Sequence, residues 1–394
     1  MRNVVIVSAA RTPVGSFGGS LASISAVQLG QKVISEVIRR AGVPGERVEE
    51  VIMGQILQAG CGQNPARQAA LGAGIPEQVP SYTVNKLCGS GLKCVALGAL
   101  AIAGGDADMV VAGGMESMSL APYLLDKARS GYRLGNGILE DSLLKDALMD
   151  AFHDIHMGVT AENIADQYRI SREEADAFAL QSQQKAAKAA SEGFFNREII
   201  AVPVSRKGGE PLPFSEDEYP RRDTTMESLA KLRPAFRKDG IVTAGNSSGI
   251  NDGAAAVLLM ERQAAEKAGI RPMARVLGWG AVGVDPKIMG MGPVEAIRKA
   301  LSRSGLKLDD VDLVELNEAF AVQSLAVIRE LSLDSRRVNV NGGAIALGHP
   351  VGASGARVLV TLLHEMERRG LRRGLAALCI GGGQGIAMVV EREG

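Results

Sequence analysis

The stretch Val33-Ile-Ser-Glu-Val-Ile-Arg-Arg-Ala-Gly42, with Val48-Glu-Glu-Val-Ile-Met53 after it, decides the fold because the chain contains this pattern twice. The first part is typical of a helix that ends at a glycine, and the second is typical of a short strand. Ala296-Ile-Arg-Lys-Ala-Leu-Ser-Arg-Ser-Gly305 and Val311-Asp-Leu-Val-Glu-Leu316 repeat it, with an offset of 263 residues at both Gly42/Gly305 and Val48/Val311. Two related halves are predicted, and chance similarity between two βα units is the alternative.

The repeat continues downstream of both copies. Val84-Asn85, a Gly-Ser-Gly turn and a helix lead to Asp108–Gly114, while Val340-Asn341, Ala353–Ala356 and a helix lead to Leu375–Gly382. Alternating strands and helices predict an α/β fold with mostly parallel sheets. The segment Gly89–Ala103 is apolar almost all round, which predicts a buried helix. One such helix in each half suggests two sheets packed around a shared helical layer.

Residues from about 120 to 247 interrupt the repeat. Ser171 and Glu174 form a capping-box pattern that predicts a long helix ending at Gly193, and a proline-rich polar stretch follows. Insertions between core elements often carry binding residues. We therefore expect three parts: residues 1–119 with 248–269 as the N-terminal half of the core, 120–247 as an inserted loop domain, and 270–394 as the C-terminal half.

Composition excludes several classes of function. Lys and Arg total 44 and so do Asp and Glu, and aromatic residues are 4%, so we expect no nucleic-acid partner. The longest nearly apolar run, Leu92–Ala103, contains Lys93 and is shorter than the ~20 residues of a membrane span. The chain start shows no cleavage site, so we expect a cytoplasmic protein without a membrane partner. Four cysteines without a CxxC spacing predict neither a disulfide framework nor a metal site.

Cys88 is the first candidate for chemistry, because Asn85-Lys-Leu-Cys88-Gly-Ser-Gly91 places it at the start of the buried helix. Unpaired N–H groups at a helix start are expected to lower a thiol pKa. The alternative is a structural cysteine, since most free cysteines are small hydrophobic residues. His349 lies in the matching loop of the second half, where it is a candidate general base or an ordinary loop histidine.

Two further candidates lie at the ends of predicted strands. Cys379 comes just before Gly381-Gly-Gly-Gln-Gly385, and a strand rather than a helix follows these glycines, which excludes a dinucleotide fingerprint. The glycines instead favour close backbone approach, with N–H groups free to bind an oxyanion. Asn317 follows the strand that ends at Leu316, and ligands bind at the carboxyl ends of strands in α/β sheets.

Four motifs together resemble the thiolase family, and within it the short-chain acetoacetyl-CoA thiolases. They are Val84-Asn-Lys-Leu-Cys-Gly-Ser-Gly91, Asn317-Glu-Ala-Phe320, Asn341-Gly-Gly-Ala-Ile-Ala-Leu-Gly-His-Pro350 and Cys379-Ile-Gly-Gly-Gly383. The motifs occur in family order and the resemblance covers essentially the whole chain. It implies a layered αβαβα core of two duplicated halves with an inserted CoA-binding loop domain.

The resemblance also implies a mechanism. Cys88 attacks an acyl thioester with help from His349, and Cys379 then removes a proton from the methyl group of a second acetyl-CoA. The product is acetoacetyl-CoA, the reverse reaction is thiolytic cleavage, and coenzyme A is a substrate and product rather than a cofactor. By resemblance, one oxyanion hole uses the N–H groups of Cys88 and Gly381, and the other uses His349 and a water held by Asn317.

The inserted domain is implied to bind CoA, and it contains a basic run around Arg233 that by itself is typical of a solvated face. By resemblance, Arg221 and Ser228 lie near the nucleotide, Ser248 and the region of His156 and Met157 contact the pantetheine, and Ala244 belongs to the same site. The residues implied to line the tunnel and acyl pocket are Leu148, Phe236, Met289, Ala319 and Phe320.

The acyl range and the assembly are further expectations. His156-Met157-Gly158 resembles the short-chain members, and a broader-range degradative 3-ketoacyl-CoA thiolase is the alternative. A cysteine hydrolase that uses Cys88, His349 and Asn317 is a competitor, but it gives no role to Cys379. A non-catalytic CoA- or lipid-binding relative is another. By resemblance we expect a homotetramer that contacts through the segment near Ala121–Leu139.

Overall fold

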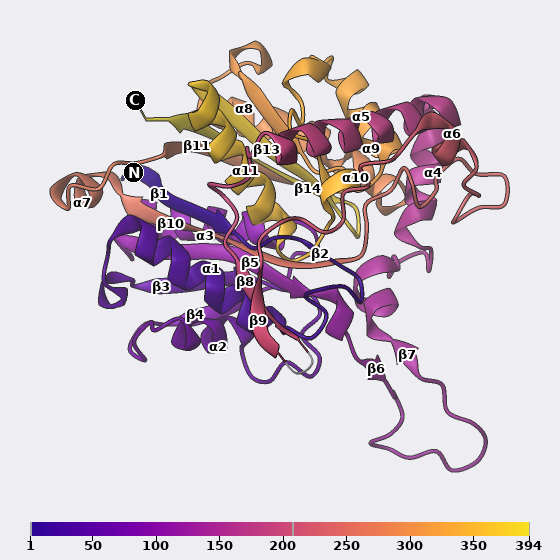
Figure 1. Ribbon diagram of the computed structural model, residues 1–394, viewed down its shortest axis with the longest axis horizontal. Coiled ribbons are helices and arrows are strands. Elements are labelled where there is room, and N and C mark those ends of the chain that lie inside the picture. Colours follow the sequence, from indigo (N-terminus) through magenta and orange to yellow (C-terminus); the bar gives the residue numbers. More distant parts are fainter. Residues whose placement is uncertain (1, 207–208, 394) are drawn as a thin grey trace.

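The computed structural model describes residues 2–206 and 209–393, and its core is one mixed sheet built from two similar halves (Figure 1). The strand order is β4-β3-β5-β10-β1 in the N-terminal half and β12-β13-β14-β11 in the C-terminal half. A short antiparallel pairing of Val5 and Ile6 with Arg275 and Ala274 joins β1 to β11. The strands are β1 Val4–Arg11, β3 Glu50–Gly54, β4 Ser81–Val84, β5 Met109–Ser117, β10 Asn251–Glu261, β11 Ala274–Gly283, β12 Leu313–Leu316, β13 Arg373–Ile380 and β14 Gln384–Arg392.

The two halves repeat one another element by element. Val338 pairs in parallel with Val314 of β12, as β4 pairs in parallel with β3. Helix α1 (Ala26–Ala41) ends at Gly42 with φ 66°, and α8 (Gly292–Ser304) ends at Gly305 with φ 67°. Glycine adopts this left-handed conformation without steric cost, which explains the glycine at both helix ends. The predicted duplication is confirmed.

The prediction of mostly parallel sheets was wrong. In the N-terminal half β3 is parallel to β4 and β5, but β10 is antiparallel to β5 and β1. In the C-terminal half β12 is parallel to β13, and β14 is antiparallel to β13 and β11. In the C-terminal half the reason is local: Gly381–Gly383 connect β13 to β14 as a hairpin, so no crossover helix intervenes.

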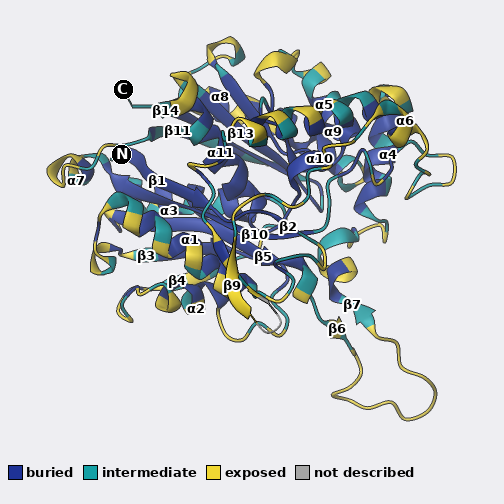
Figure 2. Ribbon diagram, in the orientation of Figure 1, coloured by how far each residue is buried: buried dark blue, intermediate teal, exposed yellow. Residues whose placement is uncertain are grey.

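Helices α3 (Ser90–Gly104) and α11 (Ser354–Arg369) form the central helical layer. They pack against each other, and α11 contacts β10 of the other half while α3 contacts β14. The segment Leu87–Gly104 is long and apolar enough to cross a membrane by composition, but more than half of it is buried inside the fold. Its apolar character is therefore explained by its central position, which Figure 2 shows as buried.

The other helices cover the outside of the sheet or belong to the insertion. Within the insertion, the side chain of Ser171 accepts the N–H of Glu174 in a complete capping box, as predicted, and the helix that it begins ends just before Glu192 and Gly193. The remaining bounds are α2 Pro65–Gly72, α4 Met157–Tyr168, α5 Arg172–Ser191, α6 Met226–Ala230, α7 Arg262–Lys267, α9 Ala321–Glu330 and α10 Ala344–Leu347.

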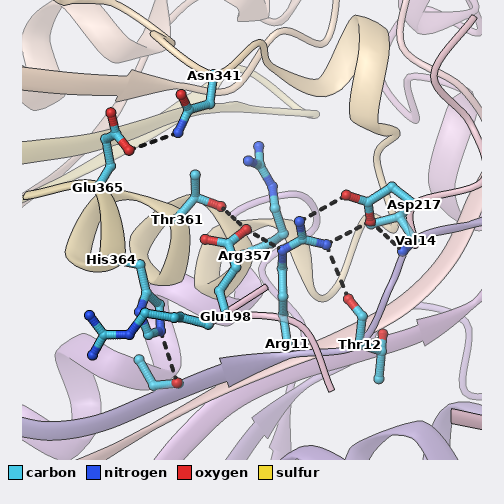
Figure 3. A network of polar contacts seen from close by, with 12 residues as sticks. Arg11, Thr12, Val14, Glu198, Asp217, Asn341, Arg357, Thr361, His364 and Glu365 are labelled. Atoms are coloured by element: carbon cyan, nitrogen blue, oxygen red, sulfur yellow. Dashed lines mark hydrogen bonds and ion pairs between the residues drawn. The ribbon is translucent and has the colours of Figure 1, made fainter. Parts of the chain in front are cut away.

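A buried ionic cluster fixes the insertion to the core (Figure 3). Arg11 of β1 is fully buried, and its guanidinium donates to Glu198 at 2.7 Å and to both carboxylate oxygens of Asp217 at 2.7 and 2.8 Å. Glu198 also accepts the hydroxyl of Thr361 on α11 at 3.1 Å. Arg11 belongs to the N-terminal half, Glu198 and Asp217 to the insertion and Thr361 to the C-terminal half, so the cluster connects all three parts. Separating them would leave a buried charge without its partner, which is energetically costly.

One part of the insertion projects from the body of the molecule. The two-residue strands β6 (Tyr123–Leu124) and β7 (Glu140–Asp141) pair at its base, and Figures 1 and 2 show the exposed loop between them. Leu134 is 98% exposed and Ile138 is 76% exposed, which is unusual for large apolar side chains. Two further pairings are β2 (Gly15–Ser16) with β10, and β8 (Val202–Arg206) with β9 (Gly209–Phe214).

Candidate active site

The site forms where the two central helices begin. Cys88 lies two residues before the start of α3, and His349 lies in the loop that leads into α11, so the contact between these helices brings the two loops together. The Cys88 loop is a tight turn: Leu87 has φ 46°, and Ser90 Oγ accepts the Lys86 N–H at 2.8 Å and donates to the Leu87 carbonyl at 2.6 Å. This turn fixes the position of the thiol relative to the helix.

The pKa of the Cys88 thiol differs from the value expected from the sequence. The Cys88 residue is half-buried, and burial raises the pKa of its thiol to about 11, although the N–H groups of Gly381 and of Cys88 itself act in the opposite direction. The prediction that the helix start would lower this pKa was therefore wrong, because loss of solvent outweighs the nearby N–H groups. Cys88 is a protonated thiol in the free protein, so it needs a base when it reacts.

Gly381 comes to Cys88 from the opposite half. It lies in the β13–β14 hairpin, where Gly382 and Gly383 have φ of 72° and 77° and permit the tight turn. The N–H of Gly381 lies near enough to the Cys88 sulfur to favour the thiolate. Cys379 is the buried residue near the end of β13, and burial together with the nearby Cys88 raises its pKa. The structure thus brings Cys88, Cys379 and Gly381 together.

His349 is a neutral imidazole with defined partners on both ring nitrogens. Burial, with a smaller contribution from the Arg357 charge, lowers its pKa to about 3. Its Nδ1 lies 2.5 Å from Ser354 Oγ, and Ser354 donates its hydroxyl hydrogen to the Pro350 carbonyl at 2.9 Å. Nδ1 is therefore the protonated nitrogen, and Nε2 keeps a lone pair that can accept a proton. Asn317 lies on that side, with its amide nitrogen 3.5 Å from Nε2.

The predicted acyl-pocket residues fall into two neighbouring apolar clusters. Leu148 packs in the cluster that contacts Cys88. His156 caps α4, accepts the Gly158 N–H on Nδ1 at 3.0 Å and stacks on Phe236 with ring centroids 4.6 Å apart. The cluster that contains Cys379 includes the other predicted acyl-pocket residues, Phe236, Met289, Ala319 and Phe320, together with Met157 from the predicted pantetheine contact. A Cβ on Gly381 would lie 3.2 Å from Leu87 of the first cluster and 3.4 Å from the Met157 sulfur of the second, so the two clusters meet at the hairpin.

A second cavity lies in the insertion beside this site. Its volume is about 270 Å³, and Arg221, Ser228 and Ala244 line it, as predicted for one binding region. Ser228 also closes a capping box with Thr225, whose carbonyl accepts its hydroxyl at 2.8 Å. Ser248 connects this region to the acyl pocket, because its N–H donates to the Ala319 carbonyl at 2.9 Å.

Sequence reasoning missed several residues at the site. Tyr219 lines the second cavity and lies under the Arg221 guanidinium, 5.7 Å from the ring centroid. Asn251, at the start of β10, accepts the His349 N–H at 2.8 Å. Ser354 fixes the His349 tautomer. The Ala353-Ser-Gly sequence by itself indicates only a helix start, and Asn251 carries no local signal because its partner is 98 residues away.

Comparison with known proteins decides the family. Residues 4–263 match the model for the thiolase N-terminal domain, and residues 270–392 match that for the thiolase C-terminal domain. This chain belongs to the thiolase family. Acetyl-CoA acetyltransferase of Escherichia coli is 61% identical over 394 residues, and that of Pseudomonas aeruginosa is 60% identical over 393 residues, with 100% of both chains covered in each case. The crystal structure of the Bacillus anthracis acetyl-CoA acetyltransferase covers 100% of this chain and 99% of its own, with a TM-score of 0.98 and 48% identity.

The arrangement around the thiolase histidine also separates it from a cysteine hydrolase. In a Cys-His-Asn hydrolase the third residue orients the imidazole through the nitrogen that does not face the thiol. Here Ser354 occupies the Nδ1 side, and Asn317 lies at Nε2, the nitrogen that is free to accept a proton. Asn317 therefore belongs to the reacting side, and its buried side-chain oxygen has no hydrogen-bond partner among the described residues.

Proposed function

We propose that this thiolase catalyses the reversible Claisen condensation of two acetyl-CoA molecules to acetoacetyl-CoA and CoA, as an acetyl-CoA C-acetyltransferase. The observation that carries the proposal is the meeting of Cys88, Cys379 and the Gly381 N–H from opposite halves of the duplicated core. The full-length similarity to enzymes named acetyl-CoA acetyltransferase supports the substrate class.

The first step is acyl transfer to Cys88. The thiol proton moves to His349 Nε2 as the sulfur attacks the thioester carbonyl, because both groups are neutral in the free protein. The bond between the carbonyl carbon and the CoA sulfur then breaks, and His349 returns the proton to the CoA thiolate. The N–H groups of Cys88 and Gly381 are placed to bind the oxyanion that forms.

The second step is carbon–carbon bond formation. Cys379, whose raised pKa keeps it protonated in the free protein, first gives its proton to the neutral His349 and then, as the thiolate, takes a proton from the methyl group of a second acetyl-CoA. The carbanion attacks the acetyl group on Cys88, Cys88 leaves as the thiolate, and the protonated His349 returns the proton to it, so both thiols and the imidazole end in their starting states. His349 and a water held by Asn317 bind the thioester oxygen of the incoming acetyl-CoA in this proposal.

Residues 120–247 act as the CoA-binding loop domain, with the core halves at 1–119 plus 248–269 and at 270–394. The 270 Å³ cavity at Arg221 binds the nucleotide end, and Ser248 lies between it and the acyl pocket. Coenzyme A is a substrate, and the reaction needs neither a resident cofactor nor a metal. The exposed apolar loop near Ala121–Leu139 forms the contact of a cytoplasmic homotetramer without nucleic-acid or membrane partners.

Covalent labelling tests the function directly. The protein is incubated with acetyl-CoA, quenched in acid and digested, and acetylated peptides are mapped by mass spectrometry. One acetyl group on Cys88 is expected, followed by release of acetoacetyl-CoA when excess acetyl-CoA is present. Labelling of Cys379 or Cys94 instead of Cys88 would overturn the assignment, and the Cys88→Ser variant should take up no thioester-linked acetyl group.

A further inference from the structure

Glu116 is a fully buried carboxylate beside the site that takes no part in the steps above. It lies near the end of β5 and accepts three backbone N–H groups: Ile56 at 3.0 Å, Leu57 at 3.2 Å and Gly352 at 3.0 Å. Ile56 and Leu57 follow β3 of the N-terminal half, and Gly352 belongs to the C-terminal half. One side chain therefore connects loops from both halves.

The two loops that Glu116 connects are walls of the active site. Ile56 and Leu57 pack with Val351 in the apolar cluster that contacts Cys88 and Leu148. Gly352 lies three residues after His349 in the same loop, before α11 begins. A displacement of Gly352 away from β5 would therefore move the imidazole relative to the thiol.

The loop that contains Gly352 packs so closely on β5 that the Glu116 side chain spans a fixed distance between them. A Cβ on Gly352 would come within 2.5 Å of Glu116 Oε2, and a Cβ on Gly114 would come within 2.1 Å of the Gly352 carbonyl oxygen. Both positions need glycine because the loop lies directly on β5. Asn251 of the neighbouring strand β10 holds the other end of the loop through the His349 N–H, at 2.8 Å.

The position of Glu116 is electrostatically unfavourable. Burial raises the pKa of Glu116 to about 7, against the effect of the three N–H donors, and the charge of Asp252 acts in the same direction as burial. A buried carboxylate costs free energy that an apolar side chain would not. An apolar residue, however, would leave three buried N–H groups without an acceptor and would not tie the loops together.

We propose that Glu116 is a positioning residue for acyl transfer, whose carboxylate holds the His349 loop against the Ile56–Leu57 wall and so sets the imidazole at the distance that Cys88 requires. The inference rests on the proposed function, because it concerns the first step of that reaction. A misplacement of about 1 Å can slow an enzymatic step about 100-fold, so the effect should be large and specific to the acyl-transfer step.

The test uses Glu116→Gln with Glu261→Gln as the matched control. Glu261 is also buried and accepts a backbone N–H, that of Ala264 at 2.8 Å, but it lies at the far end of β10. The rate of Cys88 acetylation is measured by rapid quench and intact mass. The kcat and KM for thiolysis of acetoacetyl-CoA are measured with it, and CoA binding is followed by calorimetry. We expect Glu116→Gln to slow acetylation and kcat at least tenfold with KM and CoA binding changed less than about twofold, and Glu261→Gln to match the wild type.

A second pair of variants addresses the same contact from the other loop. Gly352→Ala places a methyl group against Glu116 Oε2, whereas Gly104→Ala adds one where the nearest atom would be 4.0 Å away. Gly352→Ala should reproduce the loss of acetylation, and Gly104→Ala should not. The proposal is overturned if Glu116→Gln acetylates at the wild-type rate, or if both Glu116→Gln and Gly352→Ala lose CoA binding together with catalysis. Failure of the wild-type protein to acetylate Cys88 would instead count against the proposed function.

Discussion

Gly91 and Gly355 lie against each other at the first turns of α3 and α11, where a Cβ on Gly355 would come within 2.4 Å of the Leu92 backbone nitrogen. A Cβ on Gly91 would likewise come within 2.6 Å of the Ala356 nitrogen. The two glycines occupy corresponding places in the duplicated halves. Their contact lets the helix starts approach closely enough to bring Cys88 and His349 into one site.

Gly355→Ala should therefore lower both stability and activity. Overpacking of a tight core contact typically costs about 1–3 kcal/mol, and here the added methyl group meets backbone that cannot rotate away. Urea unfolding measures the stability, and the rate of Cys88 acetylation measures the site. Gly104→Ala, at the end of the partner helix α3, is the control and should change neither. Wild-type values for Gly355→Ala would show that the helices can separate without consequence.

Cys379→Ser should separate the two steps of the reaction. The variant keeps the Cys88 loop and the Gly381 N–H, so it should still form the acetyl-enzyme. It should lose condensation, since removal of a general base typically costs about 10²–10⁴-fold. Acetylation is followed by mass spectrometry and condensation by acetoacetyl-CoA formation. Condensation at the wild-type rate would remove Cys379 from the mechanism.

Arg221→Ala should weaken binding of the nucleotide end of CoA. Arg221 lines the 270 Å³ cavity together with Ser228, and its guanidinium is exposed to an incoming phosphate. KM for acetoacetyl-CoA should rise more than KM for the corresponding pantetheine thioester, and the difference should shrink in high salt. Arg222→Ala is the matched control, because Arg222 pairs with Glu216 at 3.4 Å outside that cavity. An equal effect of Arg221→Ala on both substrates contradicts this role.

The duplicated fold and the family could be predicted because their signals are local and occur twice. Gly42 and Gly305 end equivalent helices, and the motifs around Cys88, Asn317, His349 and Cys379 are contiguous in sequence. The direction of β10 and the pKa of Cys88 could not be predicted in this way. Strand direction depends on how the chain returns after a long insertion, and the thiol pKa depends on burial, against which the Gly381 N–H from the other half acts.

Acyl-chain length should limit the reaction. Met157, Phe236 and Phe320 enclose the Cys379 side of the site, and Phe236 and Phe320 meet edge to face at 6.2 Å. Each buried methylene gains about 0.8 kcal/mol in an accepting pocket, but a closed pocket replaces that gain with a clash. We expect kcat/KM to fall steeply from the four-carbon to the eight-carbon 3-ketoacyl-CoA. A flat or rising series would indicate the broader-range degradative thiolase.

The buried imidazole of His349 should make stability depend on pH in a defined window. Its pKa is about 3 in the folded protein because burial disfavours the cation, against an ordinary value of 6.5 in the unfolded chain. Between these values the unfolded chain binds a proton that the folded protein does not. The contribution of His349 to the free energy of unfolding is therefore fully present above pH 6.5. It is lost as the pH falls toward 3, by up to about 1.4 kcal/mol per pH unit.

Two buried carboxyl groups act in the opposite direction, so the comparison must be made with a variant. Burial raises the pKa of Glu116 to about 7 and that of Glu315 to about 8. Their contributions to the free energy of unfolding are therefore present at low pH and are lost as the pH rises through these values. The difference between wild type and His349→Gln cancels both. Urea unfolding at intervals from pH 4.5 to 8 should show a shallower acid-side slope for His349→Gln and a constant offset above pH 7.5. Parallel curves over the whole range would show that His349 does not titrate between the folded and unfolded states as its burial requires.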